Sequence, residues 1–216
     1  PDASAASYFF VAAAITQGKV KVDGLHRESC QGDIEFVDVL EKLGAKVTWG
    51  KNSIEVEGDR INGGTFDLKD FSDTAQTLAS VAAFAESEVE IKGIGFIRVK
   101  ETDRVAAIVA ELTKCGIEVT ETLDGVIIEP DKWKLKGASI ETYDDHRMAM
   151  AMSLLGLRVP HIEITNPGCV TKTFPNFFSV LEKLRPTAVS LTEAVTVAAI
   201  DGPAGSGKST VARALA

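Results

Sequence analysis

Residues 98–128 read RVKETDRVAAIVAELTKCGIEVTETLDGVII, and this stretch decides how the chain folds. Residues 102–114 carry apolar side chains at positions 105, 108, 109 and 112, the i, i+3, i+4, i+7 spacing of a helix with one buried stripe. Gly116 follows at the place where a left-handed residue ends a helix, and residues 126–128 form a short apolar run. The stretch therefore predicts an amphipathic helix that is followed by strands.

The same order of elements recurs three times along the chain. Each copy begins with an apolar helix and continues with a short strand, a glycine-marked loop and an amphipathic helix. The copies cover residues 7–56, 73–128 and 145–184. Their amphipathic helices are expected at 34–43, 102–114 and 177–184, after strands at 20–22, 89–91 and 162–164. Alternating helical and strand periods predict an α/β domain, with three similar units about a pseudo-threefold axis.

The chain divides into three segments. Residues 1–185 hold the repeats, and residues 186–194 form an expected linker because they combine Pro, Thr, Ser and Glu. Residues 195–216 begin with an apolar run, Val195 to Ile200, which leads into Gly202-Pro-Ala-Gly-Ser-Gly-Lys-Ser209. A strand before this loop and a helix after it are typical of a phosphate-binding loop.

This tail resembles the beginning of a cytidylate kinase. In such a loop the backbone N–H groups around Gly202, Gly205 and Gly207 hold phosphates, Lys208 reaches the terminal ones, and Ser209 binds magnesium. Seven residues follow Ser209. We therefore expect a truncated strand-loop-helix stub that would use ATP and Mg²⁺ only if the kinase domain were complete.

Composition excludes several classes of partner. With 23 basic and 31 acidic side chains the chain has a formal net charge of −8, which argues against nucleic acid or an anionic membrane as the general partner. No apolar stretch approaches the roughly 20 residues of a membrane span, and no signal peptide is visible. The three cysteines lack a zinc-binding spacing, so we expect reduced thiols and a cytoplasmic location. Both ends look cut, because the chain starts at Pro1 and stops inside an expected helix.

One charged cluster stands at the start of the helix in the second repeat. Lys100, Glu101 and Arg104 lie three and four residues apart, which places them on neighbouring positions of one helix face. Unpaired N–H groups and the helix dipole add positive potential there, so two cations favour phosphate or carboxylate. Taken alone, the cluster is equally consistent with a solvated face of ion pairs.

Equivalent places in the other segments add further polar residues. Asp145 can cap the helix that His146 and Arg147 begin, Lys172 follows the strand of the third repeat, and Asp73 opens the first helix of the second. Each has an ordinary structural interpretation, as a cap, a satisfied histidine or a surface lysine. Together they would focus a positive field in an otherwise acidic chain, which indicates a small polyanionic substrate. Carboxylates at Asp73 and Glu101 could move protons.

At this point the residues resemble the 5-enolpyruvylshikimate-3-phosphate (EPSP) synthase family. The similarity follows the family's order from residue 1 to residue 184, and so many long motifs in one order are very specific. The matching segments are Asp2-Ala-Ser-Ala-Ala-Ser-Tyr-Phe9, Gln31-Gly-Asp33, Ser72-Asp-Thr-Ala75, Arg98 to Arg104, Tyr143 to Met150 and Lys172-Thr-Phe-Pro175.

The resemblance implies a fold and a reaction. The family transfers the enolpyruvyl group of phosphoenolpyruvate to the 5-hydroxyl of shikimate 3-phosphate and releases phosphate, a step of aromatic amino acid biosynthesis that uses no metal or organic cofactor. Its fold is two domains of three βαβαββ units each, which close on the substrates. The chain resembles the C-terminal domain, so the N-terminal domain is an expected partner and the chain alone is expected to be inactive.

The resemblance also implies a role for each site residue. Asp73 accepts the proton of the 5-hydroxyl, and Glu101 protonates and deprotonates the methylene carbon of phosphoenolpyruvate. Lys100 holds the shikimate phosphate and positions the hydroxyl. The phosphoenolpyruvate anion is expected to bind Arg104, Arg147 and Lys172, with His146 beside them. Where many members of the family carry Asn, this chain has Phe96, which removes one hydrogen bond to shikimate 3-phosphate.

Three other interpretations remain open from the sequence. An enolpyruvyl transferase acting on a UDP-sugar shares the fold but lacks the combination of residues 100–104 with residues 145–148. A catalytically silent fragment would only bind anions or its partner domain. A nucleoside monophosphate kinase would use the repeats as a scaffold for the loop at 202–209.

Overall fold

The computed structural model of the chain describes residues 1–184, 196–198 and 214–215. The expected linker and the loop from Gly202 to Ser209 lie outside the described residues, so the predictions for them stay predictions. None of the helices in the described ranges combines the length and the apolar composition that a membrane crossing requires.

The second repeat is a complete βαβαββ unit. Its elements are β4 (Gly64–Asp67), α3 (Ala75–Ala82), β5 (Val89–Lys92), α4 (Arg104–Lys114), β6 (Glu118–Glu121) and β7 (Val126–Glu129). The strands form one sheet in the order β4-β5-β7-β6, in which β4 and β5 are parallel and the other neighbours antiparallel. A 3₁₀ turn precedes each helix, η2 (Ser72–Thr74) before α3 and η3 (Gly95–Val99) before α4.

The first and third repeats follow the same order. The first contains α1 (Ala3–Thr16), β1 (Lys19–Asp23), η1 (Gly32–Glu35), α2 (Phe36–Lys42), β2 (Lys46–Trp49) and β3 (Ser53–Glu57). The third contains β8 (Ser139–Ile140), α5 (His146–Ser153), η4 (Leu154–Leu157), β9 (Glu163–Ile164), η5 (Pro167–Lys172) and α6 (Phe177–Lys183). The expected recurrence of helix, strand, turn and helix is therefore present in all three.

The helix bounds follow from local chemistry. α4 begins at Arg104 and not at residue 102, because the Asp103 side chain accepts a hydrogen bond from the Ala106 N–H at 2.9 Å and caps the helix. Gly44 and Gly116 follow α2 and α4 with φ of 110° and 85°. This left-handed conformation costs glycine little, so both residues end their helices as the sequence predicts.

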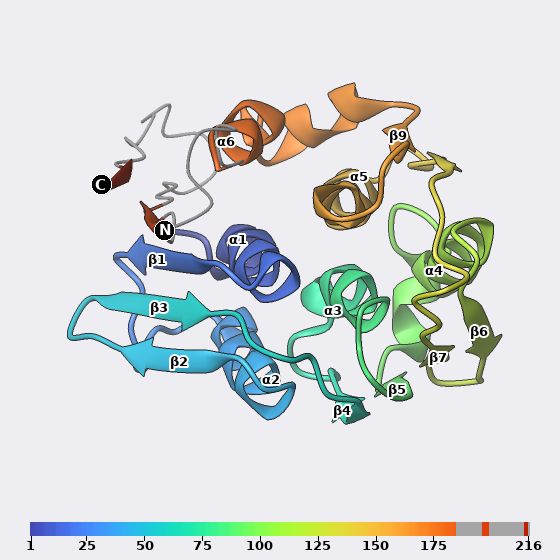
Figure 1. Cartoon of the computed structure of the whole chain (residues 1–216). Coiled ribbons are helices and arrows are strands. Elements are labelled where there is room, and N and C mark those ends of the chain that lie inside the picture. Colours follow the sequence, from blue (N-terminus) through green and yellow to red (C-terminus); the bar gives the residue numbers. More distant parts are fainter. Residues whose placement is uncertain (185–195, 199–213, 216) are drawn as a thin grey trace.

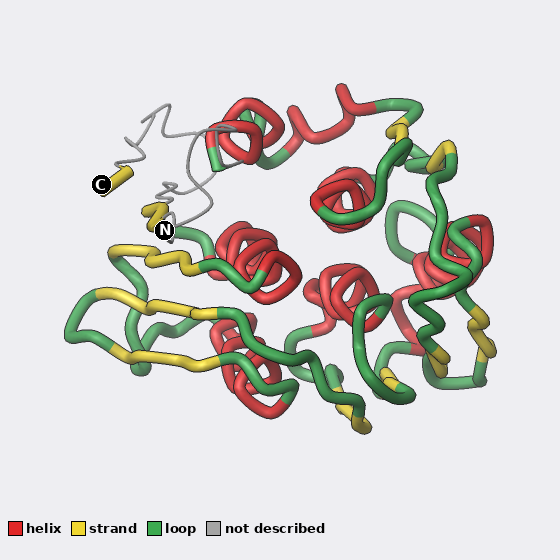
Figure 2. Tube along the Cα trace, in the orientation of Figure 1, coloured by secondary structure: helices red, strands yellow, loops and turns green. Residues whose placement is uncertain are grey.

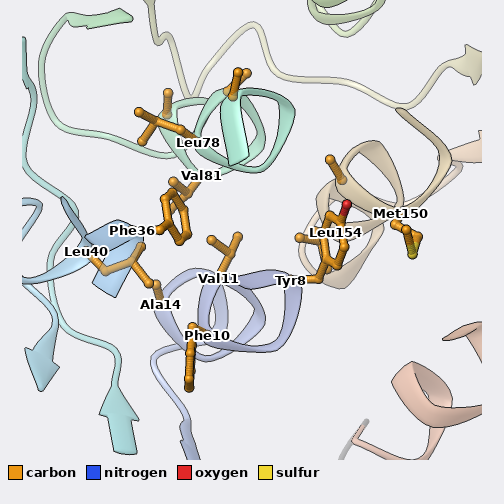
Figure 3. Close-up of a cluster of buried hydrophobic side chains, with 14 of the residues drawn as sticks. Tyr8, Phe10, Val11, Ala14, Phe36, Leu40, Leu78, Val81, Met150 and Leu154 are labelled. Carbon is orange, nitrogen blue, oxygen red and sulfur yellow. The ribbon is translucent and has the colours of Figure 1, made fainter. Parts of the chain in front are cut away.

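The helices α1, α3 and α5 lie side by side in the middle of the molecule, with the sheets at the periphery (Figures 1 and 2). From Ala3 to Ile15, all of α1 except Ser4 is buried, as expected of a helix that is apolar all round. Figure 3 shows Val11 of α1 pointing toward Val81 of α3, and Phe10 pointing away from both. The core therefore fixes how the central helices lie relative to one another.

The tail adds strands to the first sheet. β10 (Thr196–Ala198) pairs in parallel with β1, in the position that β4 takes beside β5 and β8 beside β9. The prediction of a helix at the end of the chain is wrong for β11 (Ala214–Leu215), which pairs antiparallel with β10. A short lone helix is marginal in water, whereas the edge of β10 offers unpaired backbone groups.

An aromatic cluster ties α6 to α1. Phe177 lies 5.6 Å from Tyr8, 5.8 Å from Phe9 and 5.7 Å from Phe174, measured between ring centroids. The Phe177 side chain is fully buried. Because aromatic pairs in tilted and edge-on geometry add to the free energy of burial, this contact holds the third repeat on the first.

We predict that Phe177→Ala lowers the free energy of unfolding by about 3–5 kcal/mol, since it leaves a cavity at the centre of the cluster. Chemical denaturation measures the change. Leu123→Ala is the control, because that side chain is 94% exposed and its removal creates no cavity. Equal losses for the two variants would contradict the packing role of Phe177.

Candidate active site

The N-terminal ends of the central helices meet at one end of the domain. An aspartate stands at each start: Asp2 before α1, Asp73 before α3 and Asp145 before α5. Asp2 accepts a hydrogen bond from the Ala5 N–H, and Asp145 accepts one from the Arg147 N–H at 2.8 Å. Helix starts carry unpaired N–H groups and partial positive charge, so this end of the domain favours anions.

Asp145 connects two repeats. Its side chain is fully buried, and besides capping α5 it accepts hydrogen bonds from Arg104 Nε at 2.7 Å and Nη2 at 3.4 Å. A buried carboxylate is stable only when it is paired and fully hydrogen-bonded. The pair therefore fixes the first residue of α4 against the start of α5.

Arg104 binds carboxylates with every nitrogen of its guanidinium group. Besides Asp145, it donates from Nη2 to Glu101 Oε2 at 2.7 Å and from Nη1 to Asp73 Oδ1 at 3.3 Å. The side chain is only 1% exposed. The rigid fork of guanidinium suits this task, which a lysine could not perform. Arg104 thus fixes the positions of the Asp73, Glu101 and Asp145 carboxylates.

Asp73 is shared between two arginines. Its other oxygen accepts from Arg147 Nη2 at 2.6 Å, and its backbone carbonyl lies 3.3 Å from Arg147 Nη1. The Asp73 side chain is 39% exposed, so the carboxylate that Arg104 and Arg147 hold is also accessible to solvent. An exposed and oriented carboxylate can accept a proton from a bound hydroxyl.

Glu101 is held between Arg104 and Lys172. Lys172 Nζ lies 2.7 Å from Glu101 Oε1, and this bond crosses from the second repeat to the turn η5 of the third. The hydrogen bond from Lys172 is the main reason that the pKa of Glu101 is lowered to about 2, while partial burial opposes it and Arg104 adds to it. Glu101 is therefore ionised in the structure.

Lys100 is an exposed cation directly after η3. It forms no ion pair with any residue that the structure describes, in contrast to Arg104, Arg147 and Lys172. Phe96, on the same turn, is 49% exposed. Arg104 is thus buried with every nitrogen bonded, whereas Lys100 is exposed and free to bind an incoming anion.

His146 is buried at the start of α5. Its Nδ1 has no hydrogen-bond partner among the described residues, although it lies 3.8 Å from Asp145 Oδ1. Burial, and then the charge of Arg147, lower the pKa of His146, so the imidazole is neutral near pH 7. A neutral ring beside the cations can donate or accept a hydrogen bond without changing the charge of the site.

The structure brings together six of the seven site residues that the sequence predicts, and it shows no side-chain contact between Lys100 and the other six. Asp73, Glu101, Arg104, Arg147 and Lys172 form one continuous network of ion pairs. His146 adjoins this network through its neighbour Asp145, and Lys100 precedes Glu101 in the chain. Among the described residues, no group of three or more His, Cys, Asp or Glu side chains could hold a metal ion.

Sequence reasoning missed two aspartates of the site. Asp145 is expected only as a helix cap, yet it also pairs with Arg104. Asp33 lies in the motif Gln31-Gly-Asp33 without an assigned role. In the structure it accepts a hydrogen bond from the Ser4 hydroxyl, and burial raises its pKa while the nearby Arg147 opposes that rise. Both aspartates lie beside a helix start and within a motif that resembles the family, and this position could have indicated that they belong to the site.

Fold and site together define an α/β domain of repeated units that presents a network of ion pairs and exposed cations at one end. The family model for EPSP synthase (3-phosphoshikimate 1-carboxyvinyltransferase) matches residues 1–181. The chain therefore belongs to the EPSP synthase family.

Individual relatives agree with this assignment. The chain is 48% identical over 185 residues to a 3-phosphoshikimate 1-carboxyvinyltransferase of Trichormus variabilis, covering 85% of the chain and 43% of that protein. It is 50% identical over 184 residues to the enzyme of the same name from Haemophilus influenzae, covering 85% of the chain and 42% of that protein. A solved EPSP synthase from Acinetobacter baumannii superposes with a TM-score of 0.75 at 30% identity, covering 85% of the chain and 46% of that structure. The chain thus spans less than half the length of these relatives.

We predict that Lys172→Met raises the pKa of Glu101 toward its ordinary value of 4.5, because it removes the strongest stabilisation of the ionised form. A carboxyl ¹³C NMR titration measures this value. Because the folded-state pKa is the lower one, the pair stabilises the fold above about pH 4.5, and this contribution is lost as the pH falls toward 2.

Lys100→Met is the matched control, since it removes an exposed lysine next to Glu101 in the chain that forms no ion pair with it. We expect it to leave the pKa of Glu101 nearly unchanged. A pKa for Glu101 that stays near 2 in Lys172→Met would show that another group holds the charge.

Proposed function

We propose that the chain is the C-terminal half of an enzyme that transfers the enolpyruvyl group of phosphoenolpyruvate to the 5-hydroxyl of shikimate 3-phosphate and releases phosphate. One observation carries the proposal. Two carboxylates suited to proton transfer, Asp73 and Glu101, are held in one network of ion pairs by Arg104, in a chain that belongs to the EPSP synthase family. The proposed reaction needs no metal or organic cofactor, and a biosynthetic enzyme of this kind would work in the cytoplasm.

The anionic groups of phosphoenolpyruvate would bind by exchanging with carboxylates. Lys172 is 57% exposed and pairs with Glu101, and Arg147 is 14% exposed and pairs with Asp73, so an incoming anion can take over either cation. Arg104 is buried and would reach the substrate only where Glu101 turns away. Lys100, open and unpaired within the described residues, would receive the phosphate of shikimate 3-phosphate.

Exchange of Lys172 would prepare Glu101 for its proposed role. A carboxyl group with a pKa near 2 cannot protonate carbon at neutral pH, because it holds a proton too rarely. When phosphoenolpyruvate draws Lys172 to itself, the main cause of the low pKa is removed. Binding of the substrate would thus raise the pKa of Glu101 when a proton donor is needed.

The proposed reaction then proceeds in two balanced steps. In the first, Asp73 takes the proton of the 5-hydroxyl, the hydroxyl oxygen bonds to C2 of phosphoenolpyruvate, and C3 gains a proton from Glu101. In the second, the bond from C2 to the phosphate oxygen breaks, C3 returns a proton to Glu101, and phosphate leaves with the proton that Asp73 took from the hydroxyl. The cations and helix starts stabilise the anionic groups throughout.

The network faces outward, and the N-terminal domain implied by the family would cover it. Asp73, Glu101 and Lys172 are 39%, 26% and 57% exposed, so water reaches these side chains. Closure of a second domain would exclude this water and strengthen the ion pairs with substrate.

A second activity is supported by the tail. We propose that residues 195–216 are the start of a nucleotide kinase, because the segment from Gly202 to Ser209 has the spacing of a phosphate-binding loop. In that role Gly205, Gly207 and Lys208 would contact the phosphates of ATP, and Ser209 would contact Mg²⁺.

We predict that the purified chain alone does not release phosphate from phosphoenolpyruvate and shikimate 3-phosphate, since half of the cleft is missing. Mixing it with a separately produced N-terminal domain from one of the matched relatives should restore measurable turnover. A phosphate-release assay tests both. Turnover by the chain alone would contradict the two-domain proposal, and no turnover in any mixture would count against the proposed activity.

In the assembled enzyme we predict that Glu101→Gln lowers kcat by roughly 10²- to 10⁴-fold, the usual contribution of a positioned acid or base, while substrate binding changes little. Asp73→Asn should lower kcat and also weaken binding of shikimate 3-phosphate, because Asp73 contacts the hydroxyl that reacts. Steady-state kinetics and direct binding distinguish the two. Near-normal turnover by Glu101→Gln would falsify the role given to this carboxylate.

A further inference from the structure

Glu111 is a buried carboxylate of α4 that belongs to none of the proposed chemistry. Its side chain is fully buried, and both of its oxygens are engaged. Lys114 Nζ lies 2.9 Å from Oε1 and 2.8 Å from Oε2, the Tyr143 hydroxyl donates to Oε1 at 2.6 Å, and the Glu141 N–H donates to Oε2 at 3.0 Å. Burying a carboxylate is costly unless it is bonded in this way, so the position is chemically demanding.

The residues that Glu111 holds lead directly into the site. Glu141 and Tyr143 precede Asp145, which caps α5, and Arg147, which pairs with Asp73. Between them the chain makes an unusual turn, since Tyr143 has φ of 54° and Asp144 has φ of 56°. Left-handed conformations of side-chain-bearing residues cost of order 1–3 kcal/mol each and persist only where surrounding contacts enforce them.

Two anchors on α4 enforce this turn. Arg104 binds Asp145 at the end of the turn, and Glu111 binds residues 141 and 143 at its beginning. Arg104 and Glu111 are seven residues apart, two helical turns, so they lie on the same face of α4. The segment from Glu141 to Asp145 is thus fastened at both ends to one rigid helix.

The Tyr143 hydroxyl is protonated at neutral pH and can donate to Glu111. Burial, together with the adjacent Glu111 carboxylate, raises the pKa of Tyr143 to about 12, so its hydroxyl keeps the proton that it donates. Tyr143 is 37% exposed, so its ring is only partly packed, and its hydroxyl bond to Glu111 is an additional attachment.

We propose that Glu111 is a positioning residue of the active site, which sets the orientation of Arg147 and His146 by fixing the turn through Glu141 and Tyr143. The proposal rests on the function proposed above where it concerns phosphoenolpyruvate, and on geometry alone where it concerns the turn. Glu111 touches neither substrate, so its loss should weaken the binding of phosphoenolpyruvate at Arg147 more than it slows the chemical steps.

The first test measures the turn in the chain itself. Glu111→Gln keeps the volume but loses the charge, and Tyr143→Phe removes one hydroxyl and serves if Glu111→Gln does not fold. Loss of a hydrogen bond to a charged group should speed amide exchange at residues 143–147 by about tenfold, and by about threefold in Tyr143→Phe. The His146 ring resonances should shift in both variants.

The control is Glu118→Gln, which removes an exposed carboxylate on β6 that makes no side-chain bond within the described residues. It should change neither readout. Unchanged exchange at residues 143–147 in both Glu111→Gln and Tyr143→Phe would overturn the proposal, whatever the enzyme catalyses.

The second test uses the enzyme assembled with its N-terminal domain. Glu111→Gln should raise the KM for phosphoenolpyruvate about tenfold, while kcat changes less than about threefold. Tyr143→Phe should also raise this KM, by a smaller factor than Glu111→Gln, and should change kcat less. A fall in thermal stability with an unchanged KM would reduce Glu111 to a structural role and overturn the proposal. If the unaltered enzyme shows no activity, the proposed function fails, and the exchange measurements still decide the role of Glu111.

Discussion

The buried ion pair between Arg104 and Asp145 is the interaction on which the rest of the site depends. It joins the first residue of α4 to the cap of α5, and so joins the second repeat to the third. Neither group can reach water, because Arg104 is 1% exposed and Asp145 is fully buried. Removing Arg104 would leave Asp145 as a buried carboxylate without its arginine partner, and breaking a buried pair in this way is strongly destabilising.

From that pair the network extends to two carboxylates and then to two further cations. Arg104 orients Glu101 and Asp73, and these carboxylates in turn hold Lys172 and Arg147. The innermost groups are rigid because each is bonded on several sides. Lys172 is 57% exposed and forms one ion pair, so it is the cation that can exchange its partner most easily. The repeat makes this layering possible, since it directs the starts of several helices and the turns before them to the same end of the domain.

The fold could be predicted from the sequence where a local pattern determines it. The stripe of residues 105, 108, 109 and 112 requires a helix with one buried face, and Gly116 can end it because its φ is 85°. The predicted starts of the helices were less accurate. The 3₁₀ turns η1 and η2 precede α2 and α3, and hydrophobic periodicity does not distinguish a 3₁₀ turn from the first turn of an α-helix. The strand β11 could not be predicted, since its pairing with β10 depends on where distant residues meet.

The site was predictable as a set of residues but not as a set of bonds. The motifs predict Glu101, Arg104 and Lys172 as site residues. The local sequence does not predict that Lys172 pairs with Glu101, because the two are 71 residues apart in the chain. For the same reason the second role of Asp145 was missed, because a residue that caps its own helix gives no sign of a partner on another.

Because each site carboxylate is paired with a cation, the pairs also affect how anion binding should depend on the salt concentration. A cluster of bare cations would gather mobile counter-ions and release them on binding, so its affinity for a small anion would fall steeply with added salt. Here Asp73 and Glu101 already act as tethered counter-ions of Arg147 and Lys172. An arriving anion replaces one negative group with another, and salt weakens the old pairs together with the new ones. If Arg147 and Lys172 bind the anion as proposed, their contribution to its affinity should therefore vary little with the salt concentration.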